Sequence, residues 1–246
     1  METSVLCAIH QPQYLPWLGY LSKLDDAELF VLYDDTDYKH DEWQNRNRIK
    51  LPGAAWQWLT VPVHHSKNEL IRDIRIDNSK PWRRKHLHAI DTNYGSAPFF
   101  ETCRHEFAAL YHQDWDYLAH LNAAVLKLLC RLFAITTPTV LSSTLHYSGR
   151  ATDALISICR EVGADRYLSG PGARAYLRTQ DFAAAGIELL FHDYEHPVYT
   201  QTGNGPRFVS GMAAIDLLFN CGPSSTALLR SGRRTTAHPQ HSEKTT

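Results

Sequence analysis

The chain has 246 residues, enough for a sizeable core, and its 43% hydrophobic and 21% charged residues are those of an ordinary globular protein. Its 25 basic and 26 acidic residues give a formal net charge of -1. A near-neutral chain has no overall charge that attracts nucleic acid or an anionic membrane, so we expect neither partner, and any basic site must be local.

The sequence also argues against export, membrane insertion and metal binding. Residues 1–6 run directly into His10 without the apolar segment of a secretory signal, which predicts a cytoplasmic protein. The longest apolar segment, residues 121–135, contains two charged residues and is shorter than the roughly 20 residues that span a bilayer. The five cysteines are widely spaced with no C-x-x-C pair, which favours buried thiols over a zinc site.

The first elements in chain order predict a βαβ unit. Residues 4–9 are typical of a buried strand, and leucines three positions apart indicate a short helix over 15–24. Residues 28–33 form a second apolar strand that runs into Asp34 and Asp35. Strand, helix and strand in about thirty residues imply two parallel strands of one sheet.

The chain then departs from this alternation and returns to it. Residues from about 36 to 76 predict a small antiparallel β excursion, and residues from about 80 to 134 predict a helical segment. Three later strands, alternating with helices, are predicted over residues 139–141, 166–168 and 187–191. We therefore predict an α/β fold with a Rossmann-like, mostly parallel sheet. It forms a single domain over residues 1–230, and a polar tail over 231–246 is disordered.

Polar side chains follow the predicted strands at their carboxyl ends, where open parallel sheets bind ligands. His10 follows the first strand and is the candidate general base, with Asp34 and Asp35 as catalytic carboxylates after the second strand. A carboxylate beside His10 would favour its charged form. The structural alternative is that His10 only caps a strand end. Gln11, Ser169 and Gly170 are candidate binding residues at the same edge.

Three aromatic residues, Tyr14, Trp17 and Tyr20, follow His10 within one short segment. They are candidates for the wall of a ligand pocket, and the alternative is a packed turn that anchors the first helix. Both interpretations place them next to the end of the first strand.

Arg46, Arg48 and Lys50 alternate along one segment, so on a strand the three cations share a face. Such a row suits a phosphate or carboxylate, whereas the alternative is a solvated strand face. The intervening Asn45 and Asn47 complete the set of candidate binding residues. We predict that these residues, His10 and the two aspartates line one pocket.

At these residues the sequence resembles the WbqC-like family of bacterial proteins. The matching stretches, which together cover about residues 4–222, are His10–Tyr20, Asp34–Asp35, Gln44–Lys50, Trp58–Val63, Tyr167–Gly170 and Pro197–Gln201. The resemblance implies a role in polysaccharide, O-antigen or natural-product biosynthesis and the transfer of glycine or another amino acid. It assigns no catalytic residues, so the roles given above come from the residues themselves.

A second, narrower resemblance concerns Rossmann-like nucleotidyltransferases, which carry a His-x-Gly-His motif after the first strand. Trp17 and Tyr20 stand where that motif has its two histidines. Because those histidines stabilise the transferring phosphate, their replacement counts against ordinary nucleotidyl transfer, while the fold analogy stands.

Three functions remain open at this point. The first is a transferase that moves an aminoacyl (glycyl-type) or acyl group from a small-molecule or carrier-bound donor onto an amine or hydroxyl. The second is a non-catalytic binding protein for a carrier protein or an activated sugar. The third is a divergent nucleotidyltransferase-like enzyme. No motif indicates a particular cofactor.

Overall fold

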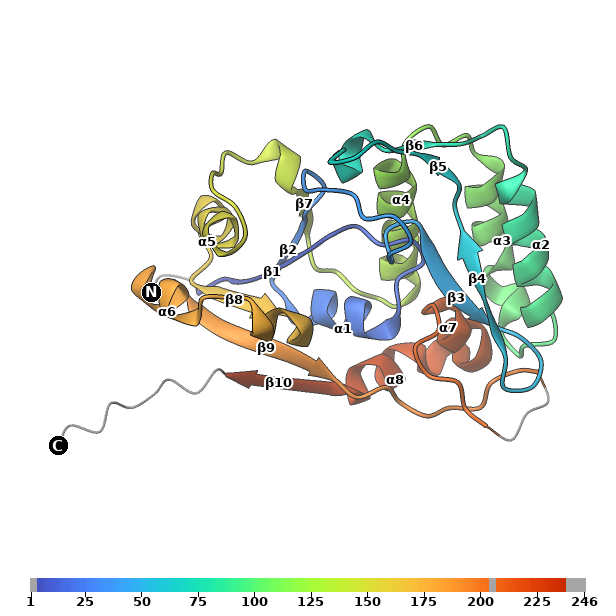
Figure 1. The fold of residues 1–246 in the computed structure, drawn as a ribbon. Helices are drawn as coiled ribbons and strands as arrows, with labels where there is room; N and C mark the ends of the chain where they lie inside the picture. The colour runs from blue at the N-terminus through green and yellow to red at the C-terminus, as the bar shows by residue number, and fades with distance from the viewer. Residues whose placement is uncertain (1–3, 204–206, 238–246) are drawn as a thin grey trace.

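The structure, a computed structural model, describes residues 4–203 and 207–237. Its centre is a six-stranded sheet with the order β10-β9-β8-β1-β2-β7 (Figure 1). The strands are β1 Leu6–His10, β2 Leu29–Leu32, β7 Thr139–Leu141, β8 Arg166–Ser169, β9 Glu188–Tyr194 and β10 Arg233–Ala237. The first five are parallel to their neighbours, and β10 alone runs antiparallel, beside β9. The predicted α/β fold with a mostly parallel sheet is thus confirmed.

Both faces of the sheet are covered, because its central strands are apolar on both sides. Leu6 and Ala8 of β1 belong to a core that contains α1 (Leu18–Asp26), whereas Cys7 and Ile9 face a second core. That second core is formed with α5 (Thr152–Glu161) and α6 (Thr179–Ala184). Helices on opposite faces define a doubly wound sheet.

A hairpin and a helical layer extend the first core away from the sheet (Figure 1). The antiparallel pairs of this layer are β3 Arg46–Lys50 with β4 Trp56–Thr60 and β5 Val63–His64 with β6 Arg75–Ile76. Its helices are α2 Trp82–Tyr94, α3 Phe100–His112 and α4 Leu118–Leu132, joined by α7 Ile215–Cys221 and α8 Ser225–Ser231. Short 3₁₀ turns occur at Ile71–Asp73, Ser142–Thr144, Pro171–Ala175 and Gly222–Ser224. The predicted antiparallel excursion and helical segment therefore both exist.

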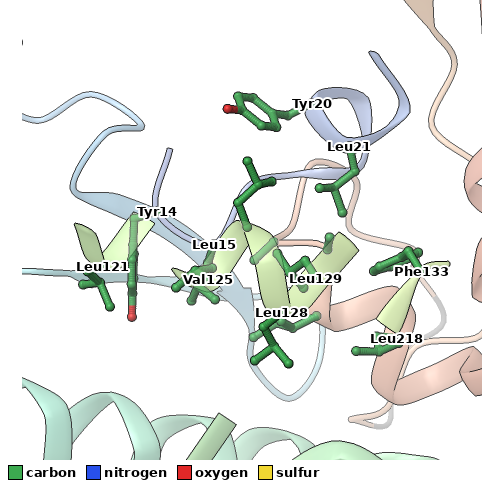
Figure 2. Packing of buried hydrophobic residues seen from close by; sticks show 14 of the residues in the cluster. Tyr14, Leu15, Tyr20, Leu21, Leu121, Val125, Leu128, Leu129, Phe133 and Leu218 are labelled. Atoms are coloured by element: carbon green, nitrogen blue, oxygen red, sulfur yellow. The ribbon is translucent and has the colours of Figure 1, made fainter. Parts of the chain in front are cut away.

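The segment after β1 is locked into this core before α1 begins. Figure 2 shows Tyr14 and Leu15 lying against Leu121 and Val125 of α4. Leu15 has a positive φ of 44°, and Pro16 follows it. A positive φ lies outside the right-handed helical region, so Leu15 cannot begin the helix. The helix α1 therefore starts at Leu18 and not at the predicted residue 15.

The carboxyl-terminal strand corrects the prediction of a disordered tail from residue 231. β10 pairs with β9 from Arg233↔Tyr194 to Ala237↔Leu190. Ion pairs add to this ladder, because Arg230 and Arg233 both bind Asp25, at the end of α1, and Arg233 also binds Asp26. Backbone pairing and paired charges order a segment that lacks apolar residues. The rest of the predicted tail, residues 238–246, lies outside the described residues.

Candidate functional site

The sheet topology fixes where a ligand site is expected. β1 and β8 are neighbours, yet the chain leaves β1 toward β2 on one side and leaves β8 toward β9 on the other. The connections that follow these two strands, through α1 and α6, cover opposite faces of the sheet. Their carboxyl ends therefore form a topological switch point, the position at which open α/β sheets leave a crevice.

A pocket of about 430 Å³ lies at this switch point. His10 and Gln11 line it from the end of β1, and Ser169 and Gly170 line it from the end of β8. Trp17, just before α1, and Lys23, within α1, also line the pocket. The segment that precedes β3 closes it with Lys39, Glu42, Trp43 and Gln44. The crevice is thus built from four separate parts of the chain.

A larger cavity of about 880 Å³ lies between α2 and α3, away from the sheet. It contains no strand-end residue, and Arg83 in its wall is paired with Asp114. We place the candidate site at the smaller pocket, because that pocket combines the switch point with two basic side chains, His10 and Lys23, of unusual pKa.

The hydrogen bond of His10 to the backbone fixes the tautomer of its ring. Its Nδ1 atom lies 3.1 Å from the carbonyl oxygen of Gln11, which only accepts, so Nδ1 carries the proton and Nε2 a lone pair. Nε2 has no hydrogen-bond partner in the part of the chain that the structure describes. The ring packs edge-on against Tyr20 at 4.8 Å between centroids. Burial, and next the charge of Lys23, lower the pKa of His10 to about 3, so the imidazole is neutral near pH 7.

Lys23 is the basic residue that the sequence interpretation missed. It is only 3% exposed, its Nζ donates to the carbonyl oxygen of Ile9 at 3.2 Å, and burial lowers its pKa to about 7. The leucine spacing had predicted one apolar face for α1, which would leave Lys23 in solvent. Instead α1 packs against β9 and α8, and every residue from Leu18 to Leu24 is buried. The overlooked signal is that the helix is short and lies between two buried strands.

Three glutamine side chains contribute neutral polar groups to the pocket wall. Gln44 Nε2 donates to Gln11 Oε1 at 2.8 Å, and the Oε1 atom of Gln13 is buried without a partner among the described residues. An unpaired buried oxygen is costly. A ligand with an N–H or O–H group would remove that cost.

Asp34 and Asp35 end β2 as predicted, but their carboxylates bind the start of the turn after β7. Asp34 accepts hydrogen bonds from Ser142 and Ser143, and Asp35 accepts one from Ser142. Neither carboxylate lines the pocket or contributes to the pKa of His10, whose charged neighbour is Lys23. The predicted carboxylate–histidine pair is therefore absent from the described residues, because the serines of the turn after β7 bind both aspartates.

The predicted aromatic wall divides into three different roles. Trp17 lines the pocket, and Tyr20 lies behind His10. Tyr14 lies in the core (Figure 2). Its hydroxyl bonds to His86 and Tyr111. Tyr14 thus anchors the first segment to the helical layer, as the packed-turn alternative predicted.

The predicted basic row does lie on β3, but it does not line the pocket, and its two arginines lie against tryptophans. The Arg46 guanidinium lies 4.4 Å from the Trp58 ring, and that of Arg48 lies 5.1 Å from Trp56 and 5.5 Å from Trp43. We call these five residues the Arg–Trp surface. Trp56 and Trp58 are exposed, and Trp43 also lines the pocket.

The other candidate residues of this segment, Lys50 and Asn47 of β3 and Asn45 just before it, are bound inside the protein. Lys50 donates to the carbonyl oxygens of Leu51, Gly53 and Thr202. The side chains of Asn45 and Asn47 are buried, and their amide nitrogens donate to Val61 and Leu15. Through these bonds the three residues hold the β3 hairpin and the segment after β1 in place, although Oδ1 of Asn45 is buried without a partner among the described residues.

The stretch Pro197–Gln201 supports the fold in a similar way. Tyr199 and Gln201 each donate to Asp216 at 2.7 Å, and Tyr94 donates to the same carboxylate at 3.0 Å. Asp216 is fully buried, and burial raises its pKa. These donors tie α7 to α2 and to the chain before it.

Two absences hold for residues 4–203 and 207–237. No helix there combines the length and apolar character needed to cross a bilayer. No three side chains of His, Cys, Asp or Glu are grouped as metal ligands within those ranges.

The fold and pocket define an α/β protein with a crevice at the switch point of a doubly wound sheet. The model of the WbqC-like protein family matches residues 11–228, and the chain belongs to this family. It is 33% identical over 234 residues to an uncharacterised protein of Mycobacterium tuberculosis, covering 92% of this chain and 98% of that protein. No solved structure matches the chain.

Proposed function

We propose that this protein is a transferase that moves an aminoacyl or acyl group to an amine or hydroxyl in the switch-point pocket. The observation that carries the proposal is that His10 lines the strand-end pocket in one tautomer, with no hydrogen-bond partner at Nε2 among the described residues. A neutral imidazole with a free lone pair is a base for an incoming nucleophile. The family match over residues 11–228 supports one domain for this activity.

The proposed reaction needs one proton relay. The acceptor N–H or O–H attacks the donor carbonyl carbon while His10 Nε2 takes the proton. The tetrahedral intermediate then expels the donor's thiol or alcohol, which leaves with that proton. Because the pKa of His10 is low, the imidazolium is short-lived and returns its proton readily.

The Arg–Trp surface offers a second contact for a long donor. Trp43 belongs both to this surface and to the pocket, so a donor that extends out of the crevice meets Arg48 and then Arg46. A carrier-bound or nucleotide-like donor with a phosphate in its arm suits guanidinium groups stacked on rings. We place the reaction in the cytoplasm, in bacterial polysaccharide, O-antigen or specialised-metabolite biosynthesis.

A donor screen tests the proposal. Purified protein is incubated with acyl- and aminoacyl-thioesters of coenzyme A and of pantetheine, together with amine and sugar acceptors, and thiol release is followed. We expect release with at least one pair, and a loss of at least about a hundredfold in His10→Asn, the usual scale for a missing base. Full activity in His10→Asn would refute the role of His10.

The matched control is His88→Asn, because His88 is an exposed histidine in the larger cavity between α2 and α3. We expect it to keep wild-type turnover, and a loss there would move the site to that cavity. Tight donor binding without turnover in the wild type would favour a non-catalytic binding protein. Pyrophosphate release from a nucleoside triphosphate would favour the nucleotidyltransferase-like alternative.

A further inference from the structure

Lys23 is a buried amine whose hydrogen bonds within the described protein use only part of its donor capacity. Its Nζ has three donors, and among the described residues one acceptor is bonded to it, the Ile9 carbonyl oxygen. The amine also lies 5.8 Å from the centroid of the Phe30 ring. A buried lysine is costly unless something in its surroundings offsets the lost hydration.

The charged and titratable groups around Lys23 do not supply a counter-ion. Of these groups, Cys7 and His10 come from β1, Tyr167 from β8, and Lys39 and Glu42 from the rim of the pocket. Glu42 is exposed, and no carboxylate in the described chain forms an ion pair with Lys23. The free amine is therefore largely neutral above pH 7, and a negative charge that stabilises its ammonium form can be supplied by a bound ligand.

We propose that Lys23 binds an oxyanion of the ligand, a phosphate or a carboxylate group, inside the switch-point pocket. The proposal deepens the function assigned to this pocket and rests on it only for the location. Lys23 lines the pocket, so an oxyanion bound there lies beside this side chain. It makes Lys23, and not the predicted β3 cations, the anion site nearest to His10.

Anion binding and protonation of Lys23 are coupled by this arrangement. Burial lowers the pKa of the free amine to about 7, whereas an adjacent anion favours the ammonium, so binding takes up a proton at neutral or higher pH. The same anion offsets the Lys23 charge that helps to lower the pKa of His10. Binding of the donor therefore makes His10 a stronger base when the reaction requires one.

The test uses two probe anions whose charge stays constant between pH 6 and pH 9. Sulfate stands for a phosphate group and acetate for a carboxylate, and their dissociation constants are measured calorimetrically with the full-length protein. For the wild type we expect one of them to bind about tenfold more weakly for each pH unit above the pKa of Lys23. We expect Lys23→Met to bind at least about tenfold more weakly at pH 6 and to lose this pH dependence.

The matched control is Lys39→Met, which removes an exposed lysine from the rim of the same pocket. It should keep the steep pH dependence, because only its long-range attraction is lost. Binding of sulfate identifies a phosphate site, and binding of acetate alone identifies a carboxylate site. Equal binding by Lys23→Met and the wild type, or no binding of either anion, overturns the proposal.

The pKa of Lys23 can also be measured in the wild type, which tests the proposal even if Lys23→Met fails to fold. In protein labelled with ¹³C at the lysine ε-carbon, one signal should titrate near pH 7 and move by at least about one pH unit upward with the bound anion. An unmoved midpoint at saturating anion also overturns the proposal. Neither readout needs turnover, so failure of the transferase assay alone leaves this test independent.

Discussion

The buried amine of Lys23 should make the stability of the protein rise with pH above neutrality. Its pKa is about 7 in the folded chain against 10.5 for a free lysine, so between these values the unfolded chain binds more protons. The free energy of unfolding therefore increases with pH in this window and is lowest, as far as Lys23 contributes, below pH 7. A difference of about 3.5 pKa units corresponds to at most about 5 kcal/mol, of which about 2 kcal/mol falls between pH 7 and pH 9.

Urea denaturation of the wild type and Lys23→Met at pH 7, 8 and 9 measures this term. The variant has no ionisable group at position 23, so its advantage over the wild type should shrink by about 2 kcal/mol from pH 7 to pH 9. A constant offset reports only the lost bond to Ile9 and is not part of the prediction. Lys127→Met, at an exposed lysine of α4, should show no such change. A pH-independent difference for Lys23→Met would refute our interpretation of the buried amine.

Three further predictions concern His86, Gly170 and β10. Burial lowers the pKa of His86 to about 4, so stability should fall below pH 6.5, and urea denaturation at pH 7 and pH 5 should show about 2 kcal/mol more loss for the wild type than for His86→Gln. Equal losses would contradict this. A Cβ at Gly170 meets no atom within 4 Å, so Gly170→Phe should melt within about 2 °C of the wild type while filling the pocket and abolishing turnover in the donor screen. Retained turnover would exclude this pocket as the site. Ending the chain after Gly232 removes β10 and the Arg233 ion pairs, so its melting temperature should fall by about 5 °C or more relative to a chain that ends after Ala237. Equal melting temperatures would show that β10 adds no stability.

The sheet was predictable because each parallel strand is a short apolar run followed by polar residues. β1 and β2 are buried on both faces, so their sequences carry a strong signal in few residues. β10 carried no such signal, since backbone pairing with β9 and the ion pairs of Arg233 order it without apolar side chains. Its polar sequence therefore had the composition of a disordered tail.

The site was predictable only as far as the strand ends. His10, Gln11 and Ser169 line one pocket because the carboxyl ends of neighbouring parallel strands meet. The partners of each polar group depend on contacts distant in sequence: Ser142 satisfies Asp34, and tryptophans of the hairpin cover Arg48. Alternation along β3 predicts which cations share a face, but it does not predict what that face contacts.

The ion pairs of Asp25 and Asp26 with Arg230 of α8 and Arg233 of β10 link the order of synthesis to completion of the pocket. Both aspartates lie at the carboxyl end of α1, where the helix dipole disfavours negative charge. Their compensating partners, Arg230 and Arg233, are made some two hundred residues later. During translation, the two arginines that neutralise Asp25 and Asp26 are therefore added about two hundred residues after the helix that carries Lys23. Ribosome-bound chains that stop before Arg230 should hold the residues of the pocket without yet holding its shape.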